Sequence, residues 1–169
     1  MISQTASDYD SLLCRHAAVD SRLLNAGLVT VDVLGDGNCL FRSLSYLITG
    51  SQDTAHISLR ASAAALIESG GAILGGVLNL SPKLLADHIR ELRTIGTCAG
   101  EEALLVLPDV VLRDIYVHQA FADPILYPVT CCLATGDPVH IAYYEGLGSD
   151  PSHYRAVVPA HNKTVSFLN

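Results

Sequence analysis

The 169-residue chain has no tryptophan and lacks any apolar run long enough to cross a membrane. Its most apolar window, residues 61–80, is interrupted by Glu68, Asn79 and four glycines. We interpret that window as a buried helix followed by a loop. The first residues have neither a basic flank nor an apolar core, which predicts no secretory signal. We therefore expect no membrane partner.

Basic residues are scarce. Ten lysines and arginines stand against seventeen aspartates and glutamates, which gives a formal net charge of -7. The basic residues are scattered singly, whereas binding to nucleic acid requires a basic stripe that neutralises phosphates. We therefore expect no nucleic-acid partner, and an acidic surface suits a basic partner instead.

Paired cysteine spacings are absent as well. The count is odd, there is no CxxC pair, and the seven histidines show no HExxH spacing. This pattern predicts neither a disulfide framework nor a structural metal, and we expect no cofactor. It favours a reducing compartment: the cytoplasm, or the host cytoplasm if the source is a virus or a bacterium. The cysteines are Cys14, Cys39, Cys98, Cys131 and Cys132.

What the chain does have is apolar content for a core, since half of its residues are apolar and 16% are charged. Its length predicts one domain over residues 1–169. Apolar periodicity and turn residues predict helices first and strands last, which is an α+β pattern. The expected helices cover residues 7–25, 39–48, 53–69, 82–94 and part of 101–112, with a break at Pro108. The expected strands cover residues 29–34, 114–119, 126–133, 138–144 and 153–158.

One turn has the composition of a nucleophile site. Residues 35–42 read GDGNCLFR, so that Cys39 follows a glycine-rich bend and begins a helix. A helix N-terminus stabilises a thiolate, and the reactive form of cysteine is the thiolate. Amides of Cys39 and of the loop containing Gly37 and Asn38 could hold an oxyanion. The alternative is that Cys39 is a small buried apolar residue, as most free cysteines are.

This octapeptide resembles the nucleophile motif of the ovarian-tumour (OTU) cysteine proteases, a papain-like group that cleaves ubiquitin from proteins. The resemblance implies a papain-like OTU fold, in which helices flank a small mixed β-sheet. It also implies a histidine at the start of a late strand, and His153 matches in the segment HYRAV after a Gly/Ser/Asp-rich loop. The similarity is strongest over residues 31–158. The tryptophan of the family's Trp-Gly turn is missing from the corresponding segment, residues 96–104.

A third residue should orient the histidine. The family often places an acid or amide two residues after it, but that position here is Arg155, which cannot serve. Asp36 matches the motif aspartate and is the first choice, although it could instead pin the oxyanion loop through backbone hydrogen bonds. Asp32 and Asn162 are the fallback orienters. We predict that Asp36→Asn lowers turnover more than Asp32→Asn or Asn162→Ala.

The resemblance implies a deubiquitinase: Cys39 attacks the isopeptide carbonyl at the C-terminus of ubiquitin, and His153 acts as general acid and base. The expected partner is ubiquitin or polyubiquitin, with ubiquitin-like modifiers as further candidates. Two alternatives stay open: a viral or bacterial protease that processes a polyprotein, and a non-catalytic ubiquitin-binding module. The remaining histidines are expected to be solvated, capping or packed: His16, His56, His88, His118, His140 and His161.

Overall fold

The structure is a computed structural model that describes residues 2–70, 77, 79–131, 134–147 and 149–161. In the described part, the helices are α1 (Ile2–Asn25), α2 (Cys39–Thr49), α3 (His56–Ser69), α5 (Pro82–Arg93), α6 (Glu101–Leu104) and α7 (Leu107–Val111). The strands are β1 (Leu28–Val31), β2 (Ile115–His118), β3 (Ile125–Tyr127), β4 (Val139–Tyr144) and β5 (His153–Pro159).

The five strands form one mixed sheet in the order β1-β5-β4-β2-β3. The β2–β4 pair is parallel, and the other three pairs are antiparallel. The register pairs Val31 of β1 with Ala156 of β5, so the first residues of β5 extend beyond the end of β1. His153 stands opposite Tyr144 of β4 at that end of the sheet.

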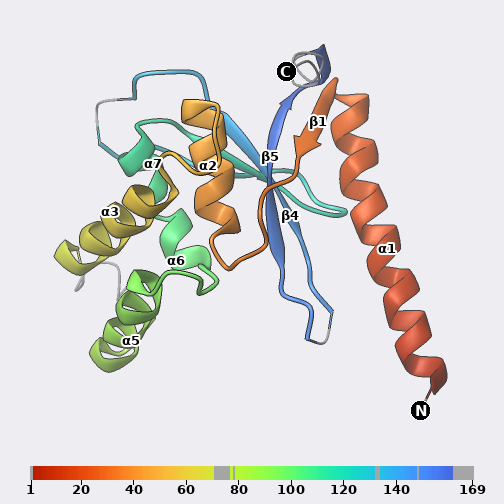
Figure 1. Cartoon of the computed structure of the whole chain (residues 1–169), viewed down its shortest axis with the longest axis horizontal. Coiled ribbons are helices and arrows are strands. Elements are labelled where there is room, and N and C mark those ends of the chain that lie inside the picture. Colours follow the sequence, from red (N-terminus) through yellow and green to blue (C-terminus); the bar gives the residue numbers. More distant parts are fainter. Residues whose placement is uncertain (1, 71–76, 78, 132–133, 148, 162–169) are drawn as a thin grey trace.

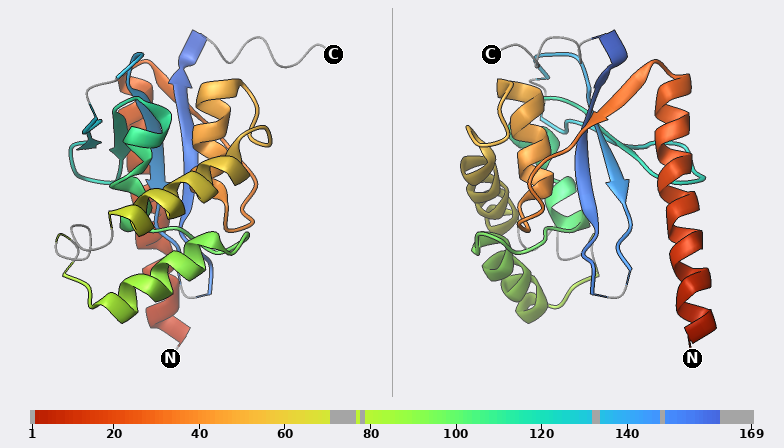
Figure 2. Two further views of the ribbon diagram at one scale, coloured as in Figure 1. Left: turned by 90° about the vertical axis from the view of Figure 1, so that its left-hand side faces the viewer. Right: turned by 45° about the vertical axis from the view of Figure 1, so that its right-hand side comes forward.

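Helices cover the sheet unequally on its two sides (Figure 1). The long α1 lies alone on one side, and α2, α3, α5, α6 and α7 lie on the other, as the turned views also show (Figure 2). Val19 and Leu23 of α1 pack on Ala142, Tyr144 and Val157 in the smaller core. The main core lies between the sheet and the other helices. No helix in the described part of the chain is both long and apolar enough to span a bilayer.

α2 and α3 owe their positions to apolar stripes at helical spacing. Leu40, Phe41 and Leu44 of α2 are at most 2% exposed and anchor that helix in the main core. α2 ends at Gly50, whose φ of 77° is the left-handed conformation that favours glycine after a helix. α5 begins as its sequence predicts, because Ser81 accepts a hydrogen bond from the Leu84 N–H and Pro82 occupies the first turn.

The predicted element order is confirmed, but several bounds differ. The strand predicted over residues 29–34 ends at Val31, and the helix predicted from residue 53 begins at His56. α1 begins at Ile2, five residues before the predicted start. The helical segment 101–112 is interrupted just before Pro108, which lies in the first turn of α7. The strand predicted to reach residue 133 ends at Tyr127, because Pro128 has no N–H for the ladder.

Side-chain carboxylates, and not a neighbouring strand, bind the segment after β3, residues 129–131. The Val129 N–H donates to the Asp114 carboxylate, and the N–H groups of Thr130 and Cys131 donate to the Asp109 carboxylate. Side-chain acceptors thus replace the strand neighbour that the prediction assumed. Cys131 therefore follows the strand rather than lying in it, and Cys132 lies outside the described residues.

Candidate active site

Cys39 is the first residue of α2, as its sequence predicts. The preceding loop, residues 35–38, turns sharply at Gly37, whose φ is +80°. A Cβ at Gly37 would lie 1.9 Å from the Gly96 carbonyl oxygen, so both the conformation and the close approach require glycine. Leu40 and Phe41 hold the first turn of the helix in the core. The cysteine is therefore fixed at a strand-loop-helix junction.

The Cys39 sulfur is covered, with the residue only 6% exposed. The Tyr154 N–H donates to Sγ at 3.5 Å, which joins the start of α2 to the start of β5. Burial raises the pKa of the Cys39 thiol above its ordinary value, although the N–H groups of Tyr154, Leu40 and Cys39 itself oppose that rise. Desolvation therefore outweighs the stabilisation of the thiolate that the amides at the helix N-terminus provide.

His153 is the first residue of β5, immediately before the residue that donates to the sulfur. Its ring lies over the nucleophile loop: Nδ1 and Cε1 are 3.7 Å from the position that a Cβ on Gly35 would occupy. Its Nε2–H donates to Oδ1 of Asp32 at 3.1 Å. That bond assigns the proton to Nε2 and leaves Nδ1 as the basic nitrogen. The structure thus brings Cys39 and His153 to the same corner of the molecule.

Asp32, one of the two fallback orienters, is the carboxylate that contacts His153. It follows β1 directly, and its side chain is 69% exposed. The same Oδ1 lies 3.1 Å from Nε of Arg155, whose guanidinium lies over the Tyr144 ring at 4.6 Å from the ring centre. Arg155, two residues after the histidine, is thus a cation. It contacts the Asp32 carboxylate and does not itself provide a carboxylate for His153.

Asp36, the first choice from the sequence, lies elsewhere. Its carboxylate accepts hydrogen bonds from Nε and Nη2 of Arg42 at 3.1 and 2.7 Å, and from the Asn38 N–H at 3.1 Å. The hydrogen bonds with Arg42 hold the pKa of Asp36 well below its usual range. Among the described residues the hydrogen bonds of the Asp36 carboxylate all come from the loop and α2, which matches the structural alternative considered for it. Asn162 lies outside the described residues.

Asn38 uses its polar groups to hold the loop. Its N–H donates to Asp36, and its side-chain Oδ1 accepts from the Gly96 N–H at 3.3 Å. The residue is 2% exposed. The Asn38 amide, expected as an oxyanion donor, is therefore already occupied, and the Cys39 amide at the sulfur is the better candidate donor.

Two arginines form part of the site, and the sequence analysis assigned a role to neither. Arg42 is 7% exposed and lies between the carboxylates of Asp36 and Asp53. Arg60 is 2% exposed and donates to the Gly37 carbonyl oxygen at 2.8 Å. The sequence does contain a signal for Arg60, because it interrupts the apolar stripe of α3 that includes Leu59, Ala63, Ala64 and Ile67. A charge at a core position implies buried polar partners.

A groove of ≈ 370 Å³ lies beside His153 on the α1 side of the sheet. Its lining includes Asp32 and His153, Leu12 and His16 of α1, and Asp150 of the β4–β5 loop. Cys39 does not contribute to that lining, which agrees with the cover over its sulfur. The groove therefore gives access to the imidazole rather than to the thiol.

The described residues contain no cluster of three or more histidine, cysteine or acidic side chains that could hold a metal ion. His118 and His140 form the closest approach to one, with Nε2 and Nδ1 at 2.9 Å. Tyr116 stacks on the His140 ring, and burial lowers the pKa of His118 to about 4. Both histidines are thus packed within the sheet, as predicted.

Solved structures with the same architecture identify the fold. The OTU domain of OTUD1 superposes with a TM-score of 0.67 over 88% of this chain and 97% of that one, at 19% sequence identity. The viral OTU domain protease of Qalyub virus gives 0.55 over 78% and 84%, at 18% identity. The chain has the OTU fold.

A third structure, an OTU domain in complex with ubiquitin, gives a TM-score of 0.56 at 17% identity and covers 78% of this chain and 69% of that one. No protein-family model and no curated protein matches the sequence. The OTU fold thus agrees with the predicted α+β, papain-like class, in which helices flank a mixed sheet.

Proposed function

We propose that this chain is a cysteine peptidase that hydrolyses isopeptide bonds at the C-terminus of ubiquitin. The observation that carries the proposal is the hydrogen bond from the Tyr154 N–H to the Cys39 sulfur. It places a cysteine at a helix N-terminus directly against the residue that follows His153. On the OTU fold, that arrangement supplies a nucleophile and a neighbouring base, the two groups that acyl transfer requires.

The resting thiol is neutral in this mechanism, because burial raises its pKa. Nδ1 of His153 takes the thiol proton as Sγ attacks the carbonyl carbon and the C=O becomes an oxyanion. The C–N bond then breaks, and His153 returns the proton to the leaving lysine amine. Water next attacks the thioester with His153 as base; the C–S bond breaks and the thiol is restored.

Asp32 supports the imidazole in this scheme. Its carboxylate holds the Nε2–H of His153 and stabilises the positive charge that forms on the ring during attack. The Cys39 N–H is one of the amides that lower the pKa of the Cys39 thiol, and it is our candidate donor to the oxyanion. Asp36 and Asn38 maintain the loop that presents them.

The substrate follows from access and from the fold. A nucleophile that is 6% exposed can meet only a slender chain, and a tail ending in two glycines has no side chains to exclude. Ubiquitin has such a tail, with basic residues before it, and the formal charge of this chain is -7. One of the structures with this fold is an OTU domain in complex with ubiquitin. We therefore name ubiquitin or polyubiquitin as the substrate, with ubiquitin-like modifiers next.

A non-catalytic ubiquitin-binding module is the second candidate, and one observation favours it: burial raises the pKa of Cys39. A thiol that stays protonated and covered could be a packed core residue. Such a module would bind ubiquitin through its surface and leave the C-terminus of ubiquitin intact. The two candidates differ in whether a covalent bond forms.

Ubiquitin carrying an electrophile at its C-terminus separates them. Incubated with the wild-type chain, it should give an adduct heavier by one ubiquitin on an intact-mass spectrum, with the modification at Cys39 in the digest. Cys39→Ala should abolish the adduct. The matched control is Cys14→Ala, which removes an exposed thiol on α1 and should leave the adduct unchanged.

Binding of ubiquitin with no adduct would contradict the peptidase and support the module. Neither binding nor adduct, together with cleavage of a Gly-Gly peptide by the same protein, would support a polyprotein-processing protease instead.

A further variant, His153→Ala, distinguishes a thiol that His153 activates from one that reacts without a base. It should retain ubiquitin binding and slow adduct formation at least about tenfold, because the proton acceptor is gone.

A further inference from the structure

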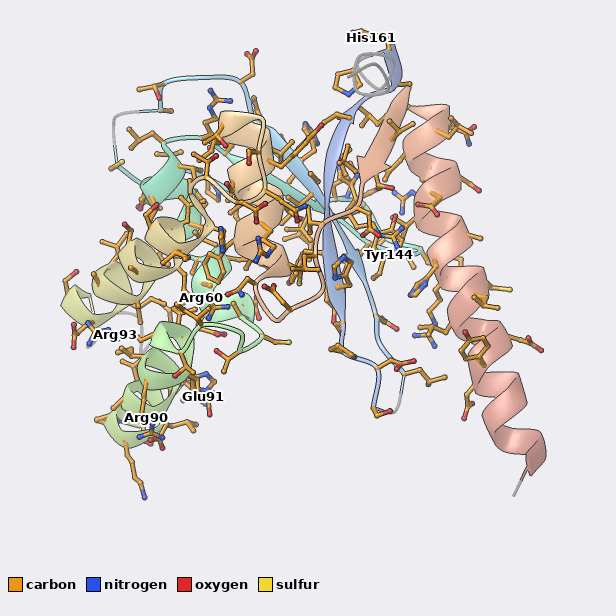
Figure 3. All side chains as sticks on the ribbon, in the orientation of Figure 1. Arg60, Arg90, Glu91, Arg93, Tyr144 and His161 are labelled. Atoms are coloured by element: carbon orange, nitrogen blue, oxygen red, sulfur yellow. The ribbon has the colours of Figure 1, made fainter. Side chains whose placement is uncertain are left out.

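Arg60 is a buried cation whose partners in the described structure are carbonyl and hydroxyl oxygens rather than a carboxylate. It lies on α3, is 2% exposed, and packs over the Phe41 ring at 4.5 Å from the ring centre. Figure 3 labels it among the helices, on the opposite side of the sheet from Tyr144 and α1. Burying a guanidinium is costly unless it is paired, and among the described residues all the hydrogen bonds of Arg60 come from its two Nη atoms, since Nε has no partner there. Its partners therefore indicate what it does.

Those partners lie at the end of α5, in the loop after it and in the loop before Cys39. Nη1 donates to the carbonyl oxygens of Leu92 and Thr94 at 2.9 and 3.2 Å, and to Oγ1 of Thr97 at 3.3 Å. Nη2 donates to the carbonyl oxygen of Thr97 at 2.5 Å and to that of Gly37 at 2.8 Å. One guanidinium thus joins the end of α5 and the loop after it to the loop that precedes Cys39.

The bond to Gly37 completes the fixation of a single peptide group. The carbonyl of the Gly37–Asn38 peptide accepts from Arg60, and its N–H donates to the Asp36 carboxylate. Asp36 is itself held by Arg42. Both ends of this peptide are therefore bound by side chains, and it cannot rotate without breaking two charge-assisted hydrogen bonds.

The direction of the carbonyl matters for the chemistry. Because Arg60 is almost fully buried, the Gly37 oxygen points into the protein interior. If the Gly37–Asn38 peptide rotated, its carbonyl oxygen would leave the interior. It would then lie near the first N–H of α2. A carbonyl oxygen near the developing oxyanion would repel it, whereas amide hydrogens stabilise it.

We propose that Arg60 is a positioning residue for acyl transfer, which keeps the Gly37 carbonyl turned inward so that the loop before Cys39 stays receptive to an oxyanion. The inference rests on the proposed function of Cys39. Arg60 touches neither the sulfur nor a substrate in this scheme. It acts through the peptide that it holds, and through the close contact of Gly37 with Gly96.

Two small reagents separate this role from simple support of the fold. p-Nitrophenyl acetate acylates the thiol through a tetrahedral oxyanion, whereas iodoacetamide alkylates the sulfur without forming one. The test compares wild type, Arg60→Lys and the control Arg93→Lys. Arg93 pairs with Glu68 on the exposed face of α5, so the same chemical change falls outside the site (Figure 3). Lysine keeps the charge of Arg60 but loses the fork that reaches both loops.

Arg60→Lys should slow acylation of Cys39 at least about tenfold, a fraction of the loss known for one oxyanion donor. Alkylation should stay within about twofold of wild type, and Arg93→Lys should change neither rate. Amide hydrogen exchange at Asn38, measured by NMR, should be faster in Arg60→Lys, because the peptide is free at one end. Acylation within about twofold of wild type, or both rates falling in parallel, would overturn the proposal.

If Arg60→Lys does not fold at 25 °C by circular dichroism, Asp36→Ala replaces it, since it releases the other end of the same peptide. The same separation of the two rates is expected, and its absence overturns the proposal in the same way. A wild-type protein that is alkylated at Cys39 but acylated by neither the ester nor electrophilic ubiquitin would contradict the proposed function. The exchange rate at Asn38 would still decide whether Arg60 fixes the peptide.

Discussion

The candidate site has a buried half and an exposed half. Cys39, Asn38 and the two arginines that hold their loop are all at most 7% exposed. On the other half, the side chains of His153 and Asp32 are 22% and 69% exposed, and the groove beside α1 gives access to them. The candidate nucleophile is thus fixed by core packing and charge-assisted hydrogen bonds, whereas the candidate base is fixed by one exposed hydrogen bond to Asp32.

This difference indicates how each half should respond to change. In the buried half, desolvation controls the charge of the thiol, and each hydrogen bond is shielded from salt. In the exposed half, water competes for the carboxylate, so its interaction with the imidazole is weaker and depends on ionic strength. Three measurements test this contrast.

The largest effect should be that of pH on the reactivity of Cys39. Because burial raises the pKa of this thiol, it is protonated at neutral pH. At pH values below the pKa, the reactive thiolate fraction increases about tenfold with each unit of increasing pH. Its alkylation by iodoacetamide, followed by mass spectrometry of the Cys39 peptide, should therefore rise about a hundredfold between pH 6 and pH 8. The peptide containing the exposed Cys14 is the internal reference, and it should react faster than Cys39 at neutral pH.

A rate for Cys39 that is flat between pH 6 and 8 would contradict this prediction. A flat rate would mean that thiolate and imidazolium exist as an ion pair in the resting protein. The charge of His153, and not burial, would then determine the ionisation of Cys39. The contrast between the two halves would not hold.

Asp36→Asn should have the next largest effect. It leaves the buried Arg42 without one of its two carboxylate partners and weakens the hold on the Asn38 amide. We expect a loss of about 2 kcal/mol in the free energy of unfolding and a fall in turnover of about tenfold. The order predicted from the sequence, with Asp36→Asn worse than Asp32→Asn, is retained for a different reason: Asp36 holds the loop and does not contact the histidine.

The pH dependence of the loss in stability tests whether the ion pair of Asp36 with Arg42 causes it. The pKa of Asp36 is depressed in the folded protein, so its ionised carboxylate contributes stability above the unfolded value of 3.8. This contribution is lost as pH falls below that value. The difference in melting temperature between wild type and Asp36→Asn should therefore be constant from pH 8 to about pH 5 and shrink below about pH 4. A difference that persists undiminished at pH 3 would contradict the ion pair with Arg42.

The buried half was the more predictable from sequence, because a contiguous motif encodes its main parts. Residues 35–42 contain the bend, the nucleophile, Asp36 and Arg42, and the glycines and helical periodicity place Cys39 at the start of α2. Two features escaped prediction, and Asp32 was named only as a fallback orienter, because all three depend on contacts across the fold. Arg60 meets the Gly37 loop from 23 residues away in sequence. Asp32 meets His153 from 121 residues away, and the burial that raises the pKa of Cys39 comes from packing.

Asp32→Asn should have the smallest effect, and it tests the exposed half directly. The variant keeps the size of the side chain and an oxygen that can accept the Nε2–H of His153, but it removes the negative charge. An exposed pair of this kind is worth up to about 1 kcal/mol, so turnover on a ubiquitin substrate should fall roughly threefold to fivefold. The melting temperature should stay within about 2 °C of wild type, since the Asp32 side chain is 69% exposed and asparagine can still accept from the Val33 N–H.

Salt sharpens this last comparison. Raising NaCl from 0.05 to 0.5 M shortens the screening length and should bring wild-type turnover closer to that of Asp32→Asn. The ratio of wild type to Asp36→Asn should not change over the same range, because Arg42 is shielded from solvent. If instead Asp32→Asn lowers turnover a hundredfold or more at both salt concentrations, the exposed carboxylate must close over the imidazole when substrate binds. The base would then be as firmly held during the reaction as the nucleophile, and the two halves would differ only in the resting protein.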